Sequence, residues 1–240
     1  MMSTLADTRV GKIVTQQPRV ARVFEELQID YCCRGATTLS EVCRIQGLDI
    51  GKVIKAVEQV KDSAEPADET CWNEVSLTEL ADHIVETHHE FLKSELPRIS
   101  VLVEKVLNAH GQKRPELEKV MQTFNLMRQE LESHMFKEEN ILFPAIRMID
   151  SQSGSHSFPF GSVANPIGMM EHEHDDAGNA LRQLRELTDG YTPPDGACPT
   201  YRVMLESLEV LERDLHLHIH KENNILFPGA QKLEKTFGIA

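Results

Sequence analysis

An eleven-residue phrase containing metal-binding residue types occurs twice in the chain. It starts at His134 and again at His218, 84 residues later, and eight of its eleven positions are identical. Each copy places a glutamate four residues after its histidine, at Glu138 and Glu222. On a helix, residues four apart lie one turn apart on the same face, so each pair can reach a single object.

The same pairs lie in line with apolar residues, such as Leu131 before His134 and Leu215 before His218. The imidazoles and carboxylates are therefore expected to point toward the core, where an unpaired charge is costly. A bound metal ion removes that cost, and first-row metals accept nitrogen and oxygen donors. The alternative is a pair of surface His–Glu contacts, but repetition of the whole phrase favours two quasi-symmetric halves that hold equivalent ligands.

A proline closes each copy of the phrase, at Pro144 and Pro228. Proline lacks a backbone N–H, and its ring clashes with the preceding turn of a helix. We therefore expect both helices to end at these prolines, at the same distance from their glutamates.

Two helices with two ligands each provide half of a binuclear site, so two further helices should contribute inward-facing histidines. The first helix offers His83, His88 and His89, and the third offers His172 and His174. Spacing alone does not choose among these five, and any one of them is more often a surface residue.

Four long helices are needed to carry these ligands. Residues Ser76–Glu79 have the form of a capping box and are expected to open the first helix. The second runs from Pro115 into the first copy of the phrase, the third covers about 166–187, and the fourth runs from about 199 through the second copy. The sequence shows no strong run of period-two alternation, so it predicts an all-α protein with an antiparallel four-helix bundle.

The N-terminal part of the chain predicts a small helical module. Residues 20–27 form one apolar helical stripe, and Thr38 and Asp49 are suited to cap two further helices. The first of three breaks rich in proline, glycine and polar residues is expected to be an interdomain linker. These breaks cover residues 62–70, 151–162 and 189–199.

Composition excludes some classes of function. The 240 residues are 40% hydrophobic, which allows a sizeable core, and the net charge is −13. Residues 1–66 hold nine basic and nine acidic residues, so the remainder carries the whole negative charge and should repel nucleic acid. The short apolar runs and the polar N-terminus predict neither a membrane span nor a secretory signal, and the expected location is the cytoplasm.

Together, these motifs resemble a known family. The two copies of the phrase, Met-Glu-His-Glu-His-Asp-Asp-Ala-Gly from Met170 and Asp-Tyr-Cys-Cys-Arg-Gly from Asp30 resemble the repair of iron centres family, of ScdA/YtfE type. Residues 76–232 resemble its hemerythrin-like di-iron bundle. The resemblance implies an ScdA-type helical module over 1–66 and a hemerythrin-like four-helix bundle over 75–236.

The resemblance also implies a ligand set and a cofactor. The first-helix ligand falls on His89 and the third-helix ligand on His174. They join four ligands from the two copies of the phrase, so that the implied set is His89, His134, Glu138, His174, His218 and Glu222. The implied cofactor is two non-haem iron ions with an oxo or hydroxo bridge and both carboxylates bridging, although this donor set would also accept manganese or zinc.

Several neighbouring histidines are left without a firm role. His110 has a family counterpart, but its role stays open. His172, His216 and His220 depart from the family pattern, and His220 is expected to face away from His218 on a regular helix.

Cys32 and Cys33 are adjacent thiols beside Arg34. One interpretation is that they are two small buried apolar residues. The other is a redox pair or a soft ligand for iron or nitric oxide adducts, with Arg34 favouring the thiolate. The family places this pair in the N-terminal module, which is thought to act with the di-iron bundle. Five cysteines without framework spacing are otherwise expected to be free thiols.

The resemblance implies repair of iron–sulfur clusters damaged by nitrosative or oxidative stress, through donation of labile iron or removal of nitric oxide. The implied partners are damaged iron–sulfur proteins and nitric oxide or another diatomic ligand, without nucleic acid or membrane, and the family suggests a homodimer. The alternatives are a cytoplasmic nitric oxide buffer or sensor and a nitric oxide reductase. Reversible oxygen carriage and a metal-free bundle are less favoured.

Overall fold

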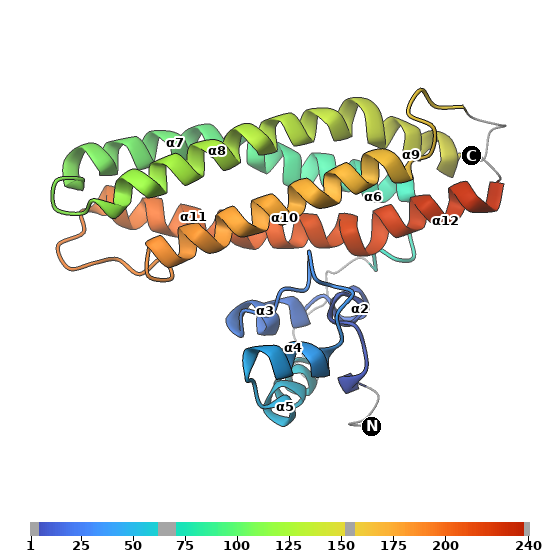
Figure 1. Ribbon diagram of the computed structural model, residues 1–240, viewed down its shortest axis with the longest axis horizontal. Helices are drawn as coiled ribbons and strands as arrows, with labels where there is room; N and C mark the ends of the chain where they lie inside the picture. The colour runs from blue at the N-terminus through green and yellow to red at the C-terminus, as the bar shows by residue number, and fades with distance from the viewer. Residues whose placement is uncertain (1–4, 62–70, 152–156, 238–240) are drawn as a thin grey trace.

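The computed structural model describes residues 5–61, 71–151 and 157–237. They form a long helical bundle with a small helical module packed against one side (Figure 1). The expectation of an all-α protein is confirmed, because the described residues contain only two isolated β-bridges besides helices and loops. No helix in these ranges is long and apolar enough to cross a membrane.

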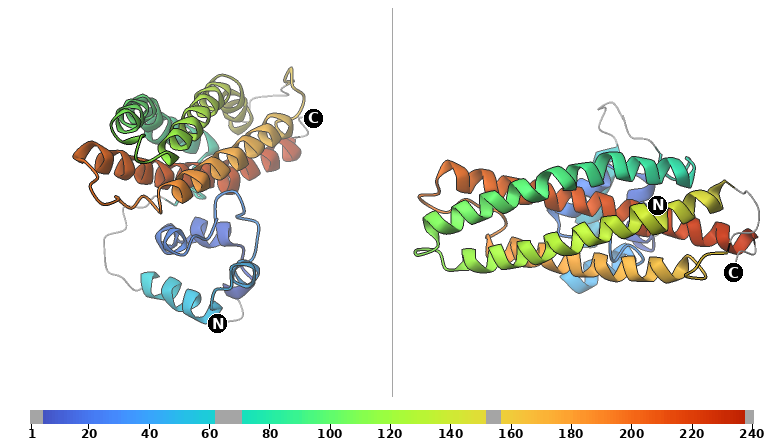
Figure 2. Two further views of the ribbon diagram at one scale, coloured as in Figure 1. Left: turned by 60° about the vertical axis from the view of Figure 1, so that its left-hand side comes forward. Right: turned by 90° about the horizontal axis from the view of Figure 1, so that it is seen from above.

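The bundle is built from four helical columns, where a column is one helix or a run of helices that follow each other without a loop. Three of the four columns contain a short π-helical turn. The columns of α7 and α11 lie beside each other, α8 packs against α7, and α10 packs against α8 (Figure 2, right). This arrangement confirms the antiparallel four-helix bundle. The columns are α6 (Leu77–Ile84), η1 (Val85–His89) and α7 (Glu90–His110); α8 (Glu116–Lys137), η2 (Glu138–Leu142) and α9 (Phe143–Asp150); α10 (Ala164–Leu187); and α11 (Pro199–Lys221), η3 (Glu222–Leu226) and α12 (Phe227–Phe237).

The prediction that Pro144 and Pro228 end their helices is wrong. Both prolines lie in the first turn of a further α-helix, α9 or α12, that continues the column. A five-residue π turn precedes each of these helices, as η2 and η3. The wider turn shifts the register of backbone hydrogen bonds, and this shift accommodates the missing N–H and the ring of the proline.

The bundle core is divided into two apolar clusters with a polar layer between them. One cluster fills the half formed by α7, α8, α11 and the second part of α10. The other fills the half formed by α6, α9, α12 and the first part of α10. Because buried polar groups are costly unless they are paired, the layer between the clusters needs internal partners or a bound ion.

The N-terminal module has a core of its own that also takes in a residue of the bundle. Ile219 of α11 is buried in this cluster. Thr38 and Asp49 accept hydrogen bonds from the first turns of their helices, as predicted from their types. The helices of the module are α2 (Val10–Gln16), α3 (Val20–Glu26), α4 (Leu39–Gln46) and α5 (Ile50–Lys61).

Helix α2 was not predicted from the sequence, and it contacts η3 of the bundle. The loop between α3 and α4 rises from the module toward the bundle (Figure 1). The expected linker, residues 62–70, lies outside the described residues. The domain limits at residues 66 and 75 therefore stay a prediction.

Candidate metal centre

The polar layer of the bundle brings together the six side chains of the implied ligand set. All six are at most 3% exposed, and both glutamates are fully buried. They form two groups of four in which the ligand atoms lie within 4.8 Å of one another, and both groups share Glu138 and Glu222. The groups are His89, Glu138, His218 and Glu222, and His134, Glu138, His174 and Glu222.

Each carboxylate lies between imidazoles of different groups. Oε2 of Glu138 is 3.3 Å from Nε2 of His89 and 3.3 Å from Nε2 of His134. Glu222 places Oε1 at 3.1 Å from Nε2 of His218 and Oε2 at 3.2 Å from Nε2 of His174. Two cation positions that share both carboxylates match this geometry.

Three of the four histidines are oriented by an acceptor on their outer nitrogen. Nδ1 of His89 lies 2.8 Å from Oε1 of Glu139, and Nδ1 of His134 lies 2.8 Å from Oε2 of Glu173. A carboxylate oxygen only accepts, so each Nδ1–H donates and Nε2 is turned toward the layer. Such partners fix the tautomer and ring orientation of metal-bound histidines.

His174 is oriented in the same way by an amide. Its Nδ1 lies 2.8 Å from Oδ1 of Asn223. Its Nε2 lies only 3.0 Å from Nε2 of His134. Two lone pairs at that distance repel each other, so a proton or a metal cation has to lie between or beside them.

The charge balance of the layer demands cations. Burial would lower the pKa of His134, but Glu138, Glu173 and Glu222 raise it to about 10. Burial and Glu222 would raise the pKa of Glu138, yet the imidazoles of His134 and His89 hold it below its ordinary value. Protons supply the positive charge when no metal is bound, and a metal displaces them.

Several buried atoms of the layer lack a well-oriented hydrogen-bond partner. Among the described residues, Nε2 of His89, both carboxylate oxygens of Glu138 and Oε2 of Glu222 are buried without a well-oriented hydrogen-bond partner. These are the atoms aimed at the two cation positions. Nitrogen and carboxylate oxygen donors in this number suit non-haem iron, so the residues present fit the implied group.

Both parts of the chain are similar to known protein families. Residues 80–230 match the model of the hemerythrin HHE cation-binding domain, and residues 6–61 match ScdA_N, a domain of unknown function (DUF542). The iron–sulfur cluster repair protein YtfE of Pectobacterium carotovorum is 36% identical over 95% of this chain and 98% of its own length. YtfE of Escherichia coli O8 is 36% identical over 93% of this chain and 96% of its own length.

The chain belongs to the YtfE family. Its hemerythrin domain is a cation-binding domain, and the His/Glu layer lies within the matched residues. The resemblance drawn from the motifs is thereby confirmed at the level of the family. The individual ligands stay a prediction, which the geometry above supports.

The other candidate histidines lie outside the two groups. His88 is buried, but its Nδ1 lies 2.8 Å from Asp214 and its Nε2 lies 2.8 Å from the amine of Lys221. His83 also contacts Lys221, through Nε2 at 2.8 Å. His172 is exposed and lies near Asp176. In this member of the YtfE family, the structure therefore brings His89 and His174 into the layer, and not their neighbours.

The remaining histidines also find places away from the layer. His110 lies with Nε2 3.3 Å from Sγ of Cys198, toward the far end of the bundle. His216 and His220 face Tyr31 of the N-terminal module, edge to face. His220 therefore points away from the layer, as expected from its position two residues after His218.

The supporting acceptors were missed in the sequence, although the repeat contains a signal for two of them. Glu139 and Asn223 occupy the same position of the phrase, directly after the shared glutamate. Each accepts from a histidine of another column, His89 or His174. Aligning the two copies marks this position as one of three that differ, but does not show which side chain it contacts.

The shared phenylalanine of the phrase has a matching role. Phe143 lies nearly parallel to the His89 ring, with centroids 5.7 Å apart. Phe227 lies parallel to the His174 ring, with centroids 5.9 Å apart. Each copy of the phrase therefore carries its own histidine and glutamate and also supports a histidine of a neighbouring column, which explains why the whole phrase is repeated.

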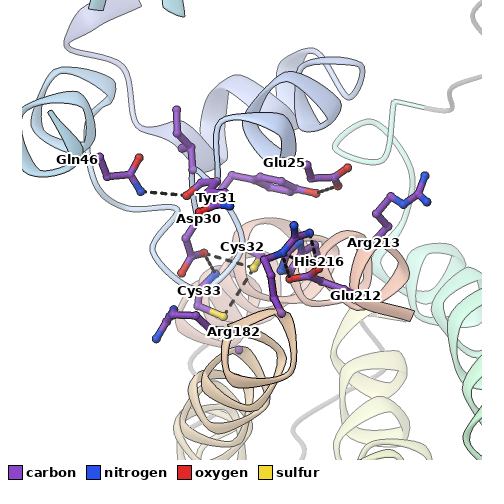
Figure 3. A pocket seen from close by; sticks show the side chains of 14 residues that line it. Glu25, Asp30, Tyr31, Cys32, Cys33, Gln46, Arg182, Glu212, Arg213 and His216 are labelled. Carbon is purple, nitrogen blue, oxygen red and sulfur yellow. Dashed lines mark hydrogen bonds and ion pairs between the residues drawn. The ribbon is translucent and has the colours of Figure 1, made fainter. Parts of the chain in front are cut away.

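Cys32 and Cys33 lie at the boundary between the module and the bundle. Their sulfur atoms are 3.7 Å apart, both as free thiols, and Cys32 is buried while Cys33 is partly exposed. Contact with Cys33 and burial raise the pKa of the Cys32 thiol well above its ordinary value. Together with Asp30 they line a pocket of about 290 Å³ between the two parts (Figure 3).

Removing the acceptor of His89 should weaken one metal position. We expect Glu139→Leu to lower iron affinity at the His89–His218 position by about 10- to 100-fold, the usual effect of losing such a partner. Titration of metal-free protein with Fe(II) measures it. Glu90→Leu is the control, because the Glu90 carboxylate contacts Lys93 and not an imidazole. Equal affinities of the two variants would contradict the orienting role of Glu139.

Proposed function

We propose that this protein repairs iron–sulfur clusters damaged by nitrosative or oxidative stress, and that it does so with a di-iron centre in the polar layer of the bundle. The observation that carries the proposal is the pair of four-ligand groups that share two fully buried glutamates. Relatives that align with nearly the whole chain bear the name iron–sulfur cluster repair protein.

The roles of the residues follow from the two groups. His89 and His218 would hold one iron, His134 and His174 the other, and both carboxylates would bridge. When bound, such iron supplies exchangeable metal and a coordination place for a small ligand such as nitric oxide.

The surrounding residues shield the polar layer from water and orient its ligands. The apolar clusters on both sides exclude water, and the outer acceptors hold the imidazoles with Nε2 inward. With two histidines for each iron, the cost of releasing one ion is limited, because protons on the imidazoles would then neutralise the carboxylates while the outer acceptors keep the rings in place.

The proposed setting is the cytoplasm, with damaged iron–sulfur proteins as partners and nitric oxide as a small ligand. The excess of acidic residues after residue 66 disfavours nucleic acid as a partner. A homodimer stays a prediction from the family.

Mixing the protein with an iron-depleted or nitrosylated [4Fe–4S] enzyme tests the proposal. Iron-loaded protein is expected to restore the activity of that enzyme faster than metal-free protein does. His174→Ala should lose this advantage, whereas His172→Ala should keep it, because His172 is exposed and outside the layer. Equal recovery with loaded and metal-free protein would contradict repair by this centre.

The same mixture separates the alternative functions. Formation of iron nitrosyl in proportion to the protein, without recovery of the enzyme, would indicate a nitric oxide buffer or sensor. Repeated turnover to nitrous oxide with an electron donor would indicate a nitric oxide reductase.

A further inference from the structure

The loop that carries the vicinal cysteines rests against the outer wall of the polar layer. The Cys33 thiol lies 3.5 Å from the main-chain carbonyl oxygen of His174. Gly178, one turn further along α10, faces the same sulfur: a Cβ there would lie 3.5 Å from it, an ordinary van der Waals contact. Figure 3 shows both thiols at the tip of the loop, beside the helices of the bundle.

Asn223 joins this loop to a ligand of the centre. Its Oδ1 accepts from Nδ1 of His174 at 2.8 Å, and its Nδ2 donates to the main-chain carbonyl oxygen of Cys32 at 3.4 Å. An amide side chain offers an acceptor oxygen and two N–H donors in one planar group. Glu139, at the same position in the first copy of the phrase, accepts from His89 but as a carboxylate has nothing to donate.

Asn224 holds the loop in place beside Asn223. Its Nδ2 donates to the carbonyl oxygens of Tyr31 at 3.3 Å and Cys32 at 3.1 Å. Its Oδ1 occupies the space that two glycines leave open, because a Cβ on Gly11 or on Gly35 would come within 2.2 Å of it. The module is therefore shaped to receive this side chain.

The first copy of the phrase has no such role. Asn140, which corresponds to Asn224, donates to the carbonyl oxygen of Phe136 in its own column at 2.8 Å. The two copies are thus alike in their support of the metal layer and differ where the module docks. That difference makes the two metal positions unequal: the His134–His174 position lies next to the cysteine loop through Asn223.

We propose that Asn223 is a positioning residue that couples docking of the vicinal-cysteine loop to metal binding at the His134–His174 position. This inference rests on the metal centre proposed above. With Nε2 engaged by a metal, the His174 ring would be fixed with Nδ1–H directed to Asn223, and the Asn223 amide would in turn be held toward the Cys32 carbonyl. Coupling between two sites is reciprocal, so a docked loop favours metal at this position and metal favours the docked loop.

The rate at which the Cys33 thiol is alkylated measures whether the cysteine loop is docked. Iodoacetamide is added anaerobically to full-length protein, either metal-free or loaded with Fe(II), and alkylation of each cysteine is followed by peptide mass spectrometry. Iron is expected to slow alkylation of Cys33 by about 5-fold or more, the lower range of typical allosteric coupling. Cys71 is exposed and serves as an internal reference with an unchanged rate.

Two variants and one control separate the coupling from metal binding. Asn223→Asp keeps an acceptor for His174 but has no donor for Cys32, so it should still bind two irons and lose the effect of iron on Cys33. Asn140→Asp is the same type of substitution in the first copy of the phrase, at the position that corresponds to Asn224, and should keep that effect because the Asn140 amide donates within its own helix column. Gly11→Ala, which displaces the amide of Asn224, provides a second route to undocking and should behave as Asn223→Asp does.

The outcomes separate the two proposals. If wild-type protein binds two irons but iron leaves the Cys33 rate unchanged, the coupling is wrong and the metal centre stands. The coupling is also wrong if Asn223→Asp and Gly11→Ala both retain the iron effect. If wild-type protein binds no iron, the metal centre fails and the coupling fails with it.

Discussion

Replacing Glu222 with alanine is expected to abolish iron binding at both positions, whereas His218→Ala should retain one iron. Glu222 contributes an oxygen to both four-ligand groups, but His218 belongs to one. Loss of the shared carboxylate also removes a negative charge that both cations need. Iron quantification per chain after anaerobic loading and desalting measures the difference.

The matched control for these variants is His172→Ala, which lies outside the layer and should retain both irons. Retention of two irons by Glu222→Ala would show that this carboxylate is not shared. Loss of both irons from His218→Ala, with the fold intact by circular dichroism, would mean that the two positions are not filled independently.

Phe227→Ala is expected to lower the free energy of unfolding of the metal-free protein by about 3–5 kcal/mol. The Phe227 ring is fully buried, lies in the apolar cluster beside the metal layer and packs parallel to the ring of His174. Its removal leaves a cavity that the surrounding helices cannot fill, and it frees the histidine ring to tilt. Urea denaturation followed by circular dichroism measures the loss.

Phe136→Ala is the control for that cavity, because Phe136 is 63% exposed. Its effect should stay within about 0.5 kcal/mol, as is usual for surface substitutions. A loss for Phe227→Ala no larger than this would contradict its role as a packing support of the layer.

Much of the fold follows from local features of the sequence. Thr38, Asp49 and Ser76 cap helices because their side-chain oxygens accept from the backbone of the next turn, which needs no distant partner. The four-residue spacing of His134 with Glu138 and of His218 with Glu222 likewise places each pair on one face of a single column, without a distant partner.

The choice among neighbouring histidines could not be made locally. His88 and His89 are both buried, but Asp214 and Lys221 of α11 satisfy His88, while Glu139 and Glu138 of the second column direct His89 into the layer. The sequence gives no sign of which column will supply these partners, so only the family resemblance pointed to His89.

The π turns could not be predicted either, and for a different reason. They depend on a shift in backbone hydrogen-bond register, while the side-chain pattern of Glu138 to Leu142 remains helical. Each π turn contains a residue of the implied ligand set, namely His89, Glu138 or Glu222. Such turns are frequent at functional sites, where they redirect side chains that a regular helix would place elsewhere.

The docking contacts of Asn223 and Asn224 could not be predicted from the sequence either. Their amides meet backbone atoms of Tyr31 and Cys32, about 190 residues earlier in the chain. No periodicity links such distant segments. Gly11 and Gly35 are the glycines that leave room for Asn224. Nothing in the sequence marks them for this function, which is clear only from the close approach of the module.

Mössbauer spectroscopy of the iron-loaded wild-type protein, with iron counted per chain, tests the central claim most directly. Two irons per chain in one magnetically coupled pair are expected, since both would share the carboxylates of Glu138 and Glu222. A single uncoupled iron per chain, or two irons without magnetic coupling, would contradict a centre bridged by these two residues.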